Sequence, residues 1–387
     1  MHRFLGLALP WLLILTIPAL LGFGPPRLVE SDRQQLPVYA GQLPGIAAAT
    51  PPPLKGMAAL VMDAATGRVV YERNGYHHMA PASITKLMTA LVTLDRAQLT
   101  DRVTIKPEHM VEGSTMGLLP GEQPTVEDLL WGLMLPSGND AAQALAHTLG
   151  GGSAERFIGW MNEKALALGM RDTHFRNSHG LDDDGHYSTA FDMALLARHV
   201  LNHPLLARMA ATPSHTVRIG QRMFYLANTN RLLDQSAIPG VDGLKTGFTD
   251  HAGDSLLASA TRNGRRVIVV VLGTNRERTP AAAALIEHAF SAFTWVPVGT
   301  PPFGQWPGTS APPRRIVAGL QREEMVPRWQ LPYLRAIAHV TVPPGDGSAQ
   351  PVGPVGRLVY RTGDRRLIEL PLFFEDTRNR EGAESGS

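Results

Sequence analysis

Three short motifs in this sequence combine residue types that could carry out nucleophilic catalysis. The first is Ser83-Ile-Thr-Lys86, in which a hydroxyl group stands three residues before an amine. In a helix, positions i and i+3 lie on one face, with Cβ atoms about 5–6 Å apart. Lys86 Nζ could therefore hydrogen-bond to Ser83 Oγ and, when neutral, accept its proton. The spacing indicates an activated serine nucleophile.

Lysine is rare in this chain, which makes Lys86 informative. The chain has 36 Lys and Arg residues, of which only five are Lys, so 31 are Arg. Arg stays protonated in proteins, whereas a buried Lys can lose its proton. A Lys retained at this position therefore indicates a need for an amine that can become neutral.

Two further motifs strengthen the prediction, because Ser-x-x-Lys alone is also compatible with a helix N-cap and a solvated charge. Ser137-Gly-Asn139 lies between two predicted helices, where its side chains can point into a cleft. Lys245-Thr-Gly247 lies on a predicted strand that could pair with an extended peptide. Each motif alone is typical of a turn or a strand end. Together, in this order, they indicate one site.

The elements that must position these motifs can be predicted from periodicity. A helix is expected from Ser83, because the apolar residues that follow recur at helical spacing. Thr125-Val-Glu-Asp128 has the pattern of a capping box that opens a second helix. Pro136-Ser-Gly138 should end that helix, and an Ala-rich helix should begin near Asp140.

Strands are predicted on both sides of this helical region. Residues 57–62 and 68–72 read as a hairpin with a turn at Gly67, and residues 254–261 and 265–272 as a hairpin across Asn263-Gly264. A helix is expected over 280–290. The fold class is therefore α+β, an antiparallel sheet flanked by helices at 55–296. Strands at 335–342, 357–361 and 366–374 predict a small β-sandwich-like domain at 297–376, followed by a disordered tail, 377–387.

The N-terminal region predicts export. His2-Arg3 precedes an uncharged apolar run, Phe4–Phe23, so residues 1–24 are expected to be a signal peptide or an N-terminal membrane anchor, with cleavage left open. Seven prolines within 24–54 indicate a linker, assigned to 25–54. The tail has no apolar face, so any membrane attachment is expected from the N-terminal run. A net charge of +2 without a dense basic run argues against nucleic-acid binding, and the absence of Cys excludes thiol chemistry.

With all three motifs present, the chain resembles the serine penicillin-binding proteins and β-lactamases, and within them the low-molecular-mass D-alanyl-D-alanine carboxypeptidases of the peptidase S11 type. The resemblance covers about residues 55–376. Besides the three motifs, it is carried by His179-Gly-Leu181, Tyr187–Met193, Asn228-Thr-Asn230 and Gly240–Gly247. It implies a penicillin-binding, serine β-lactamase-like fold and removal of the terminal D-alanine from peptidoglycan stem peptides ending in D-Ala-D-Ala. It also implies inhibition by β-lactams, no cofactor, and action at the periplasmic or extracytoplasmic face of the bacterial cytoplasmic membrane.

The resemblance also assigns roles to positions of this sequence. Ser83 would be the acyl-ester nucleophile, Lys86 its general base and Ser137 the proton relay. Asn139 would bind the substrate amide, while Lys245 and Thr246 hold the terminal carboxylate. Arg278 would assist with that carboxylate, with Arg276 as an alternative, and the backbone N–H groups of Ser83 and Phe248 would form the oxyanion hole. Repulsion between two buried lysines should neutralise Lys86, while Lys245 keeps its charge.

Rival interpretations remain at this stage. Three His residues, His174, His179 and His186, stand among Asp172, Asp182, Asp183 and Asp184 and suggest a metal site, but no His pair has metal-ligand spacing on one helix. No metal is therefore expected, and Asp192 is interpreted as structural. A β-lactamase is a second interpretation, although the second motif is Ser-Gly-Asn and no matching deacylating Glu segment is evident. A non-catalytic peptidoglycan-binding or β-lactam-sensing module is a third.

Overall fold

The computed structural model describes residues 50–54, 56–234, 238–299, 305–306, 314–340 and 353–374. It divides into two compact units: one comprises Pro51–Ser291, and the other contains the described residues from Ala292 onward. The predicted N-terminal segment, most of the linker and the tail lie outside the described residues. Within the described part, no helix is both long and apolar enough to span a membrane.

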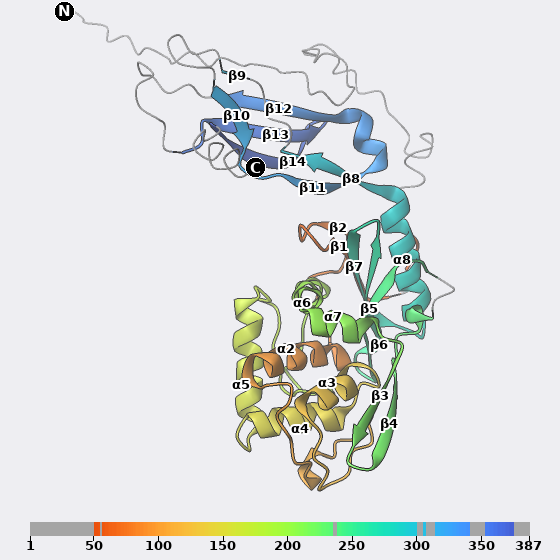
Figure 1. The fold of residues 1–387 in the computed structure, drawn as a ribbon. Helices are drawn as coiled ribbons and strands as arrows, with labels where there is room; N and C mark the ends of the chain where they lie inside the picture. Colours follow the sequence, from red (N-terminus) through yellow and green to blue (C-terminus); the bar gives the residue numbers. More distant parts are fainter. Residues whose placement is uncertain are drawn as a thin grey trace, which may run out of the picture. The chain divides into compact units, whose positions relative to one another are not determined.

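A five-stranded antiparallel sheet forms the framework of the first unit (Figure 1). Its strand order is β2-β1-β7-β6-β5, so β5, which carries Lys245, lies at an edge. The strands are β1 (Ala58–Asp63), β2 (Val69–Arg73), β5 (Val241–Thr249), β6 (Gly253–Arg262) and β7 (Arg265–Thr274). Both predicted hairpins are confirmed. Asn263 and Gly264 each have positive φ, as a two-residue hairpin turn requires.

Helices surround this sheet and hold most of the apolar core. They are α2 (Lys86–Arg96), α3 (Val126–Met134), α4 (Asn139–Leu149), α5 (Ala154–Ala167), α6 (Ala190–Asn202), α7 (Pro204–Ala211) and α8 (Arg278–Ala292). Short 3-10 turns occur at Ala82–Thr85 (η2), Pro107–His109 (η3) and Arg231–Leu233 (η4). Helix α6 packs on the sheet against β1 and β7, while α2 packs against α4 and α5 in the helical part (Figure 1). The α+β architecture predicted from the sequence is confirmed.

The predicted capping box at Thr125 is confirmed, and it fixes the start of α3. Thr125 Oγ1 accepts a hydrogen bond from the backbone N–H of Asp128, and Asp128 Oδ2 accepts one from the N–H of Thr125. One boundary differs from the prediction, because Ser83 lies in η2 and the α-helix begins only at Lys86. Ala82 has a φ of 47°, which prevents a regular helix from extending through this turn.

A two-stranded hairpin, β3 (Ser214–Ile219) with β4 (Arg222–Ala227), follows α7. This hairpin was not predicted from the sequence. One of its faces is exposed, and Met223 and Tyr225 are 63% and 74% accessible there. The chain then leads through Asn228–Asn230 to β5.

The second unit is mostly β-structure with its own apolar core. Its larger sheet has the order β12-β13-β14-β10-β9, and a separate ribbon pairs β8 with β11. The strands are β8 (Phe293–Val298), β9 (Gln305–Trp306), β10 (Arg314–Ala318), β11 (Arg322–Pro327), β12 (Leu334–Val340), β13 (Gly356–Thr362) and β14 (Arg365–Phe374), with η5 at Arg328–Tyr333. The three strands expected here are present, and four more are added.

Candidate active site

Ser83 and Lys86 form a direct hydrogen bond inside the first unit. Lys86 Nζ lies 2.8 Å from Ser83 Oγ and 2.6 Å from the carbonyl oxygen of His179. The Lys86 side chain is fully buried, so its amine contacts protein groups in place of water. The two residues predicted to be nucleophile and base therefore lie at a distance that allows proton transfer.

The pKa of Lys86 is lowered well below its ordinary value. Burial is the main cause, because it penalises the charged ammonium, and the positive charge of Lys245 adds to it. The carboxylate of Asp140 opposes this shift. Lys245, in the third motif, and Asp140, directly after the second, are therefore both within electrostatic range of Lys86.

Two close backbone approaches hold Ser83 in place. Gly180, with φ of 89°, lies so near Ala82 that a Cβ atom there would meet the Ala82 carbonyl oxygen at 1.9 Å. On the other side, a Cβ on Gly247 would lie 3.0 Å from Ala82 Cβ and 3.3 Å from Ser83 N. The backbone at Gly180 leaves no room for a Cβ atom, and a Cβ at Gly247 would require Ala82 or Ser83 to move by a few tenths of an ångström. The segment carrying Ser83 is thus packed between the loop at Gly180 and the end of β5.

Ser137 lies at the sharp connection between α3 and α4. Its φ is 66°, an uncommon conformation for a residue other than glycine. Its Oγ is buried and has no hydrogen-bond partner within the described part of the chain. A strained residue with an unpartnered buried hydroxyl is typical of a functional position, because the missing partner would be the ligand.

Asn139 and Asp140 connect the start of α4 to the loop at 112–118. The Asn139 side-chain amide donates to the carbonyl oxygen of Glu112. The buried carboxylate of Asp140 accepts hydrogen bonds from the backbone N–H groups of Met116, Gly117 and Leu118. Asp140 was not among the predicted site residues. Its position directly after the Ser-Gly-Asn motif was the only signal, since the pairing with a distant loop cannot be read from spacing.

Lys245 and Thr246 are both buried on β5. Lys245 Nζ donates a long hydrogen bond, 3.4 Å, to the carbonyl oxygen of Thr246. Burial and the nearby charge of Arg278 lower the Lys245 pKa to about 7. Thr246 Oγ1 lies 2.6 Å from Thr229 Oγ1. Thr229 lies in Asn228-Thr-Asn230, one of the segments that carry the family resemblance, but its contact with Thr246 was not predicted.

Arg278, and not Arg276, reaches the end of β5. Arg278 Nη1 donates to the carbonyl oxygen of Gly247 at 3.1 Å and pairs with Asp254 Oδ1 at 2.7 Å. Arg276 is exposed, with a φ of 57°. The geometry therefore favours Arg278 among the two candidates. Asp254 holds its guanidinium against β5.

Phe248 follows Gly247 on β5, and its side chain is 60% exposed. The hydroxyl of Thr249, one residue further on, donates to Asp182 Oδ1 at 2.6 Å. This contact ties the end of β5 to the loop that follows Gly180. The backbone of Phe248 is thereby fixed near the turn that carries Ser83.

The His-rich loop serves structure in this geometry. His186 Nε2 lies 2.9 Å from Thr85 Oγ1, and burial lowers the pKa of His186 to about 4. Burial and the charge of Lys86 lower the pKa of His179 to about 3. Asp192 accepts a hydrogen bond from Thr173 Oγ1, in keeping with a structural role. Among the described residues, no group of three or more His, Cys, Asp or Glu side chains could hold a metal ion.

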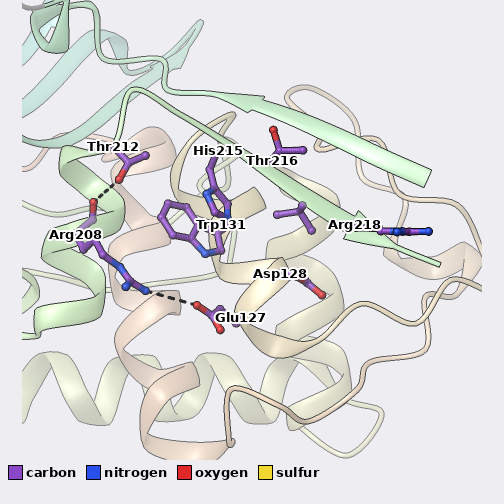
Figure 2. Close-up of a pocket in the computed structure, with 9 residues that line it drawn as sticks. Glu127, Asp128, Trp131, Arg208, Thr212, His215, Thr216 and Arg218 are labelled. Carbon is purple, nitrogen blue, oxygen red and sulfur yellow. Dashed lines mark hydrogen bonds and ion pairs between the residues drawn. The ribbon is translucent and has the colours of Figure 1, made fainter. Parts of the chain in front are cut away.

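A separate hollow of about 490 Å³ lies between α3, α7 and β3 (Figure 2). Its aromatic groups, Trp131 and His215, stack on each other with ring centroids 3.8 Å apart. Its charged groups also pair, since Arg208 Nη2 lies 3.6 Å from Glu127 Oε1 (Figure 2). These aromatic and charged groups interact with one another, and they include no nucleophile–base pair. The candidate active site is therefore the one formed by the three motifs.

Comparisons with known proteins agree with the geometry. The family model for D-alanyl-D-alanine carboxypeptidase, peptidase S11, matches residues 46–276. The chain belongs to the D-alanyl-D-alanine carboxypeptidase family. The family match spans all three motifs, so the predicted family is confirmed.

Individual relatives extend this similarity. D-alanyl-D-alanine carboxypeptidase DacC of Escherichia coli (strain K12) is 36% identical over 341 residues, 83% of this chain and 84% of the relative. DacF of Bacillus subtilis (strain 168) is 38% identical over 251 residues, and the match spans 62% of this chain and 64% of DacF. Penicillin binding protein 5 from Haemophilus influenzae superposes with a TM-score of 0.74 at 27% identity, covering 84% of this chain and 98% of that one. The fold of the carboxypeptidase family is thus shared well beyond the first unit.

Proposed function

We propose that this chain is a serine D-Ala-D-Ala carboxypeptidase that acts through an acyl-enzyme on Ser83. The observation that carries the proposal is the 2.8 Å hydrogen bond between Lys86 Nζ and Ser83 Oγ, made by a fully buried amine with a lowered pKa. A neutral amine at this distance can accept the hydroxyl proton as Oγ attacks a carbonyl carbon. Membership in the carboxypeptidase family supplies the substrate class, a peptide ending in D-Ala-D-Ala.

The acylation step assigns a task to each group around the nucleophile. Ser83 Oγ attacks the carbonyl carbon of the penultimate D-alanine, and its proton passes to Lys86 Nζ. The N–H groups of Ser83 and Phe248 stabilise the oxyanion that develops. The C–N bond to the terminal D-alanine then breaks, and the leaving amine receives a proton through Ser137. The unpartnered Oγ of Ser137 supports this relay role.

Substrate binding falls to the second and third motifs. The terminal carboxylate of the peptide would meet the ammonium of Lys245 and the hydroxyl of Thr246, with Arg278 adding positive charge behind β5. An anion here would also restore the charge of Lys245, whose pKa is lowered by burial. Asn139 would orient the substrate amide. Water then hydrolyses the ester, with Lys86 again accepting the proton.

The proposal extends to where the enzyme works. The apolar run Phe4–Phe23 supports export, either as a cleaved signal or as an anchor, and peptidoglycan lies outside the cytoplasmic membrane. We place the activity at the extracytoplasmic face of that membrane. β-Lactams, which acylate the same type of serine, are expected inhibitors.

Release of free D-alanine tests the proposed activity. The wild-type chain should release D-alanine from an N-acylated peptide ending in D-Ala-D-Ala, and Ser83→Ala should release none. Ser214→Ala, at an exposed position on β3, serves as the control and should match the wild type. D-Alanine release that persists in Ser83→Ala would refute the assignment of the nucleophile.

A further inference from the structure

One face of the larger sheet in the second unit is strongly basic. The opposite face of β12, β13 and β14 packs into the core with residues such as Leu334, Leu358 and Leu370. Successive side chains of a strand alternate between faces. Alternation therefore puts Arg335, Arg357 and Arg361 on the outer face. A β-bulge in the β13–β14 pairing shifts the register, and Arg366 reaches the same face, where it pairs with Glu369.

The strand register brings three of these arginines into one row. Arg335 on β12 pairs with Arg361 on β13, which in turn pairs with Arg366 on β14. The next row of like orientation is Ile337, Val359 and Glu369, and in the row beyond it His339 pairs with Arg357. Like charges directly opposite each other on a sheet are destabilising. A row of three guanidinium groups is thus unfavourable unless an anion binds there.

The described residues supply little negative charge to this face. Glu369 pairs with Arg366 at 2.6 Å and lies 3.6 Å from Arg357, so two guanidinium groups share one carboxylate. Arg335 and Arg361 donate instead to backbone carbonyl oxygens, those of Leu334 and Asp364. Arg366 and Arg357 remain 63% and 57% exposed. Their outer N–H groups face solvent.

The face is also hollowed, with apolar residues among the charges. A depression of about 570 Å³ is lined by Arg357, Arg366, Leu367, Glu369 and Pro371. At the end of η5, directly before β12, Tyr333 is 54% exposed. Arginine forks suit phosphate oxygens, and Tyr is enriched at membrane–water interfaces.

We propose that this outer face, defined by Arg335, Arg357, Arg361 and Arg366, docks on anionic phospholipid headgroups. An extended sheet face bearing a row of cations matches a planar array of phosphates better than it matches a single small anion. The apolar run Phe4–Phe23, which predicts delivery to a membrane, provides a second and independent contact. Two weak attachments reinforce each other, because the second then occurs at high effective concentration. The inference does not depend on the catalytic assignment.

Vesicle binding of the full chain tests the proposal. Binding is compared on vesicles of phosphatidylcholine alone and of phosphatidylcholine with phosphatidylglycerol, so that any contribution of the N-terminal run appears in both. For the wild type, the bound-to-free ratio should be at least about tenfold higher on the anionic vesicles, since each basic residue near an anionic surface contributes severalfold. The variant Arg335→Gln/Arg357→Gln/Arg366→Gln should lose most of this preference, and the corresponding Lys variant should keep most of it.

A matched control separates a defined face from overall charge. Arg102→Gln/Arg171→Gln/Arg218→Gln removes three exposed arginines from the first unit and should leave the anionic preference unchanged. The proposal would be overturned if both Gln variants lost the preference for anionic vesicles equally. It would also be overturned if the Arg335/Arg357/Arg366 variant kept that preference in full. The proposal would also be overturned if the variant Arg335→Gln/Arg357→Gln/Arg366→Gln kept its preference for anionic vesicles but no longer sedimented with isolated peptidoglycan. That result would indicate that the face binds a cell-wall polymer. D-Alanine release should be unchanged in every variant.

Discussion

Lys86 and Lys245 are both buried, but their surroundings give them different tasks. Lys86 contacts Ser83, the proposed nucleophile, and burial together with the charge of Lys245 favours the neutral form of Lys86. The sequence led us to expect that Lys245 keeps its charge. Burial and Arg278 lower its pKa to about 7, so without a bound anion its charge is only partial near neutral pH. The structure therefore makes the charge of Lys245 dependent on the substrate.

Arginine substitutions distinguish the two lysines. Lys86→Arg places a permanent cation beside Ser83 Oγ, so acylation should fall by at least about 100-fold, the scale of general-base catalysis. Lys245→Arg keeps a cation for the substrate carboxylate and should retain a measurable fraction of the rate. The measurement is the rate of penicilloyl adduct formation by intact-mass spectrometry. Equal losses in the two variants would contradict this division of labour.

The pH dependence of substrate binding follows from the Lys245 pKa. Its folded-state value is depressed to about 7, so the ammonium is present below that pH and is lost as pH rises through it. KM for a peptide ending in D-Ala-D-Ala should therefore increase above about pH 7. In Lys245→Arg the cation persists, and KM should stay nearly constant from about pH 6 to about pH 9. A similar alkaline rise of KM in both proteins would exclude Lys245 as its source.

Thr229 is expected to orient the hydroxyl of Thr246. The two oxygens lie 2.6 Å apart, so when Thr229 donates, the proton of Thr246 is free to point at a substrate carboxylate. Thr229→Val should raise KM by about 5–10-fold, the worth of one hydrogen bond, with little change in kcat. Thr229→Ser keeps the hydroxyl and should behave like the wild type. A decrease confined to kcat, or no rescue by Ser, would argue against this role.

At the scale of elements, the end of β5 and the turn η2 must approach closely for the oxyanion hole to form. A Cβ at position 247 would lie 3.3 Å from Ser83 N and 3.0 Å from Ala82 Cβ. Gly247→Ala should push the two segments apart and lower kcat for D-alanine release by about 100-fold or more, as loss of an oxyanion-hole donor does. Thermal unfolding and kinetics report stability and activity separately.

Gly159→Ala provides the control for this substitution. Gly159 lies on the exposed side of α5, and a Cβ there would meet nothing within 4 Å. Replacing a helical glycine with alanine should slightly raise the thermal stability and leave the activity unchanged. An active Gly247→Ala enzyme would mean that Phe248 does not complete an oxyanion hole with Ser83.

The elements also show what a single sequence can predict. The hairpin at Asn263-Gly264 and the capping box at Thr125 depend on neighbouring residues, so local rules found them. The tasks of Asp140 and Thr229 depend on partners 22–24 and 17 residues away, across loops whose paths no periodicity reveals. The hairpin β3–β4 was missed because its flanking segments carry no strong turn pair beyond Gly220. Ser83 was placed in an α-helix because the left-handed Ala82 leaves no trace in residue type.

At the scale of the whole molecule, motif order carried more information than any one element. Three motifs spread over about 160 residues pointed to one site, and the structure places the first and third against each other through the contact of Gly247 with the Ser83 segment. The net charge of the chain did not indicate the basic face of the second unit. The arginines of this face come together only through the strand register, which the sequence alone does not show. The three motifs therefore predicted the catalytic chemistry, but nothing in the sequence alone predicted the basic face.

The central claim is that Ser83 forms an acyl-enzyme and that the same serine releases D-alanine. Intact-mass analysis of the chain mixed with benzylpenicillin tests it most directly, with D-alanine release from an acylated D-Ala-D-Ala peptide measured on the same sample. We predict a long-lived penicilloyl adduct on Ser83 together with peptide hydrolysis, and neither in Ser83→Ala. An adduct without hydrolysis would indicate a sensor, and rapid turnover of the penicillin a β-lactamase. Either result would contradict the account.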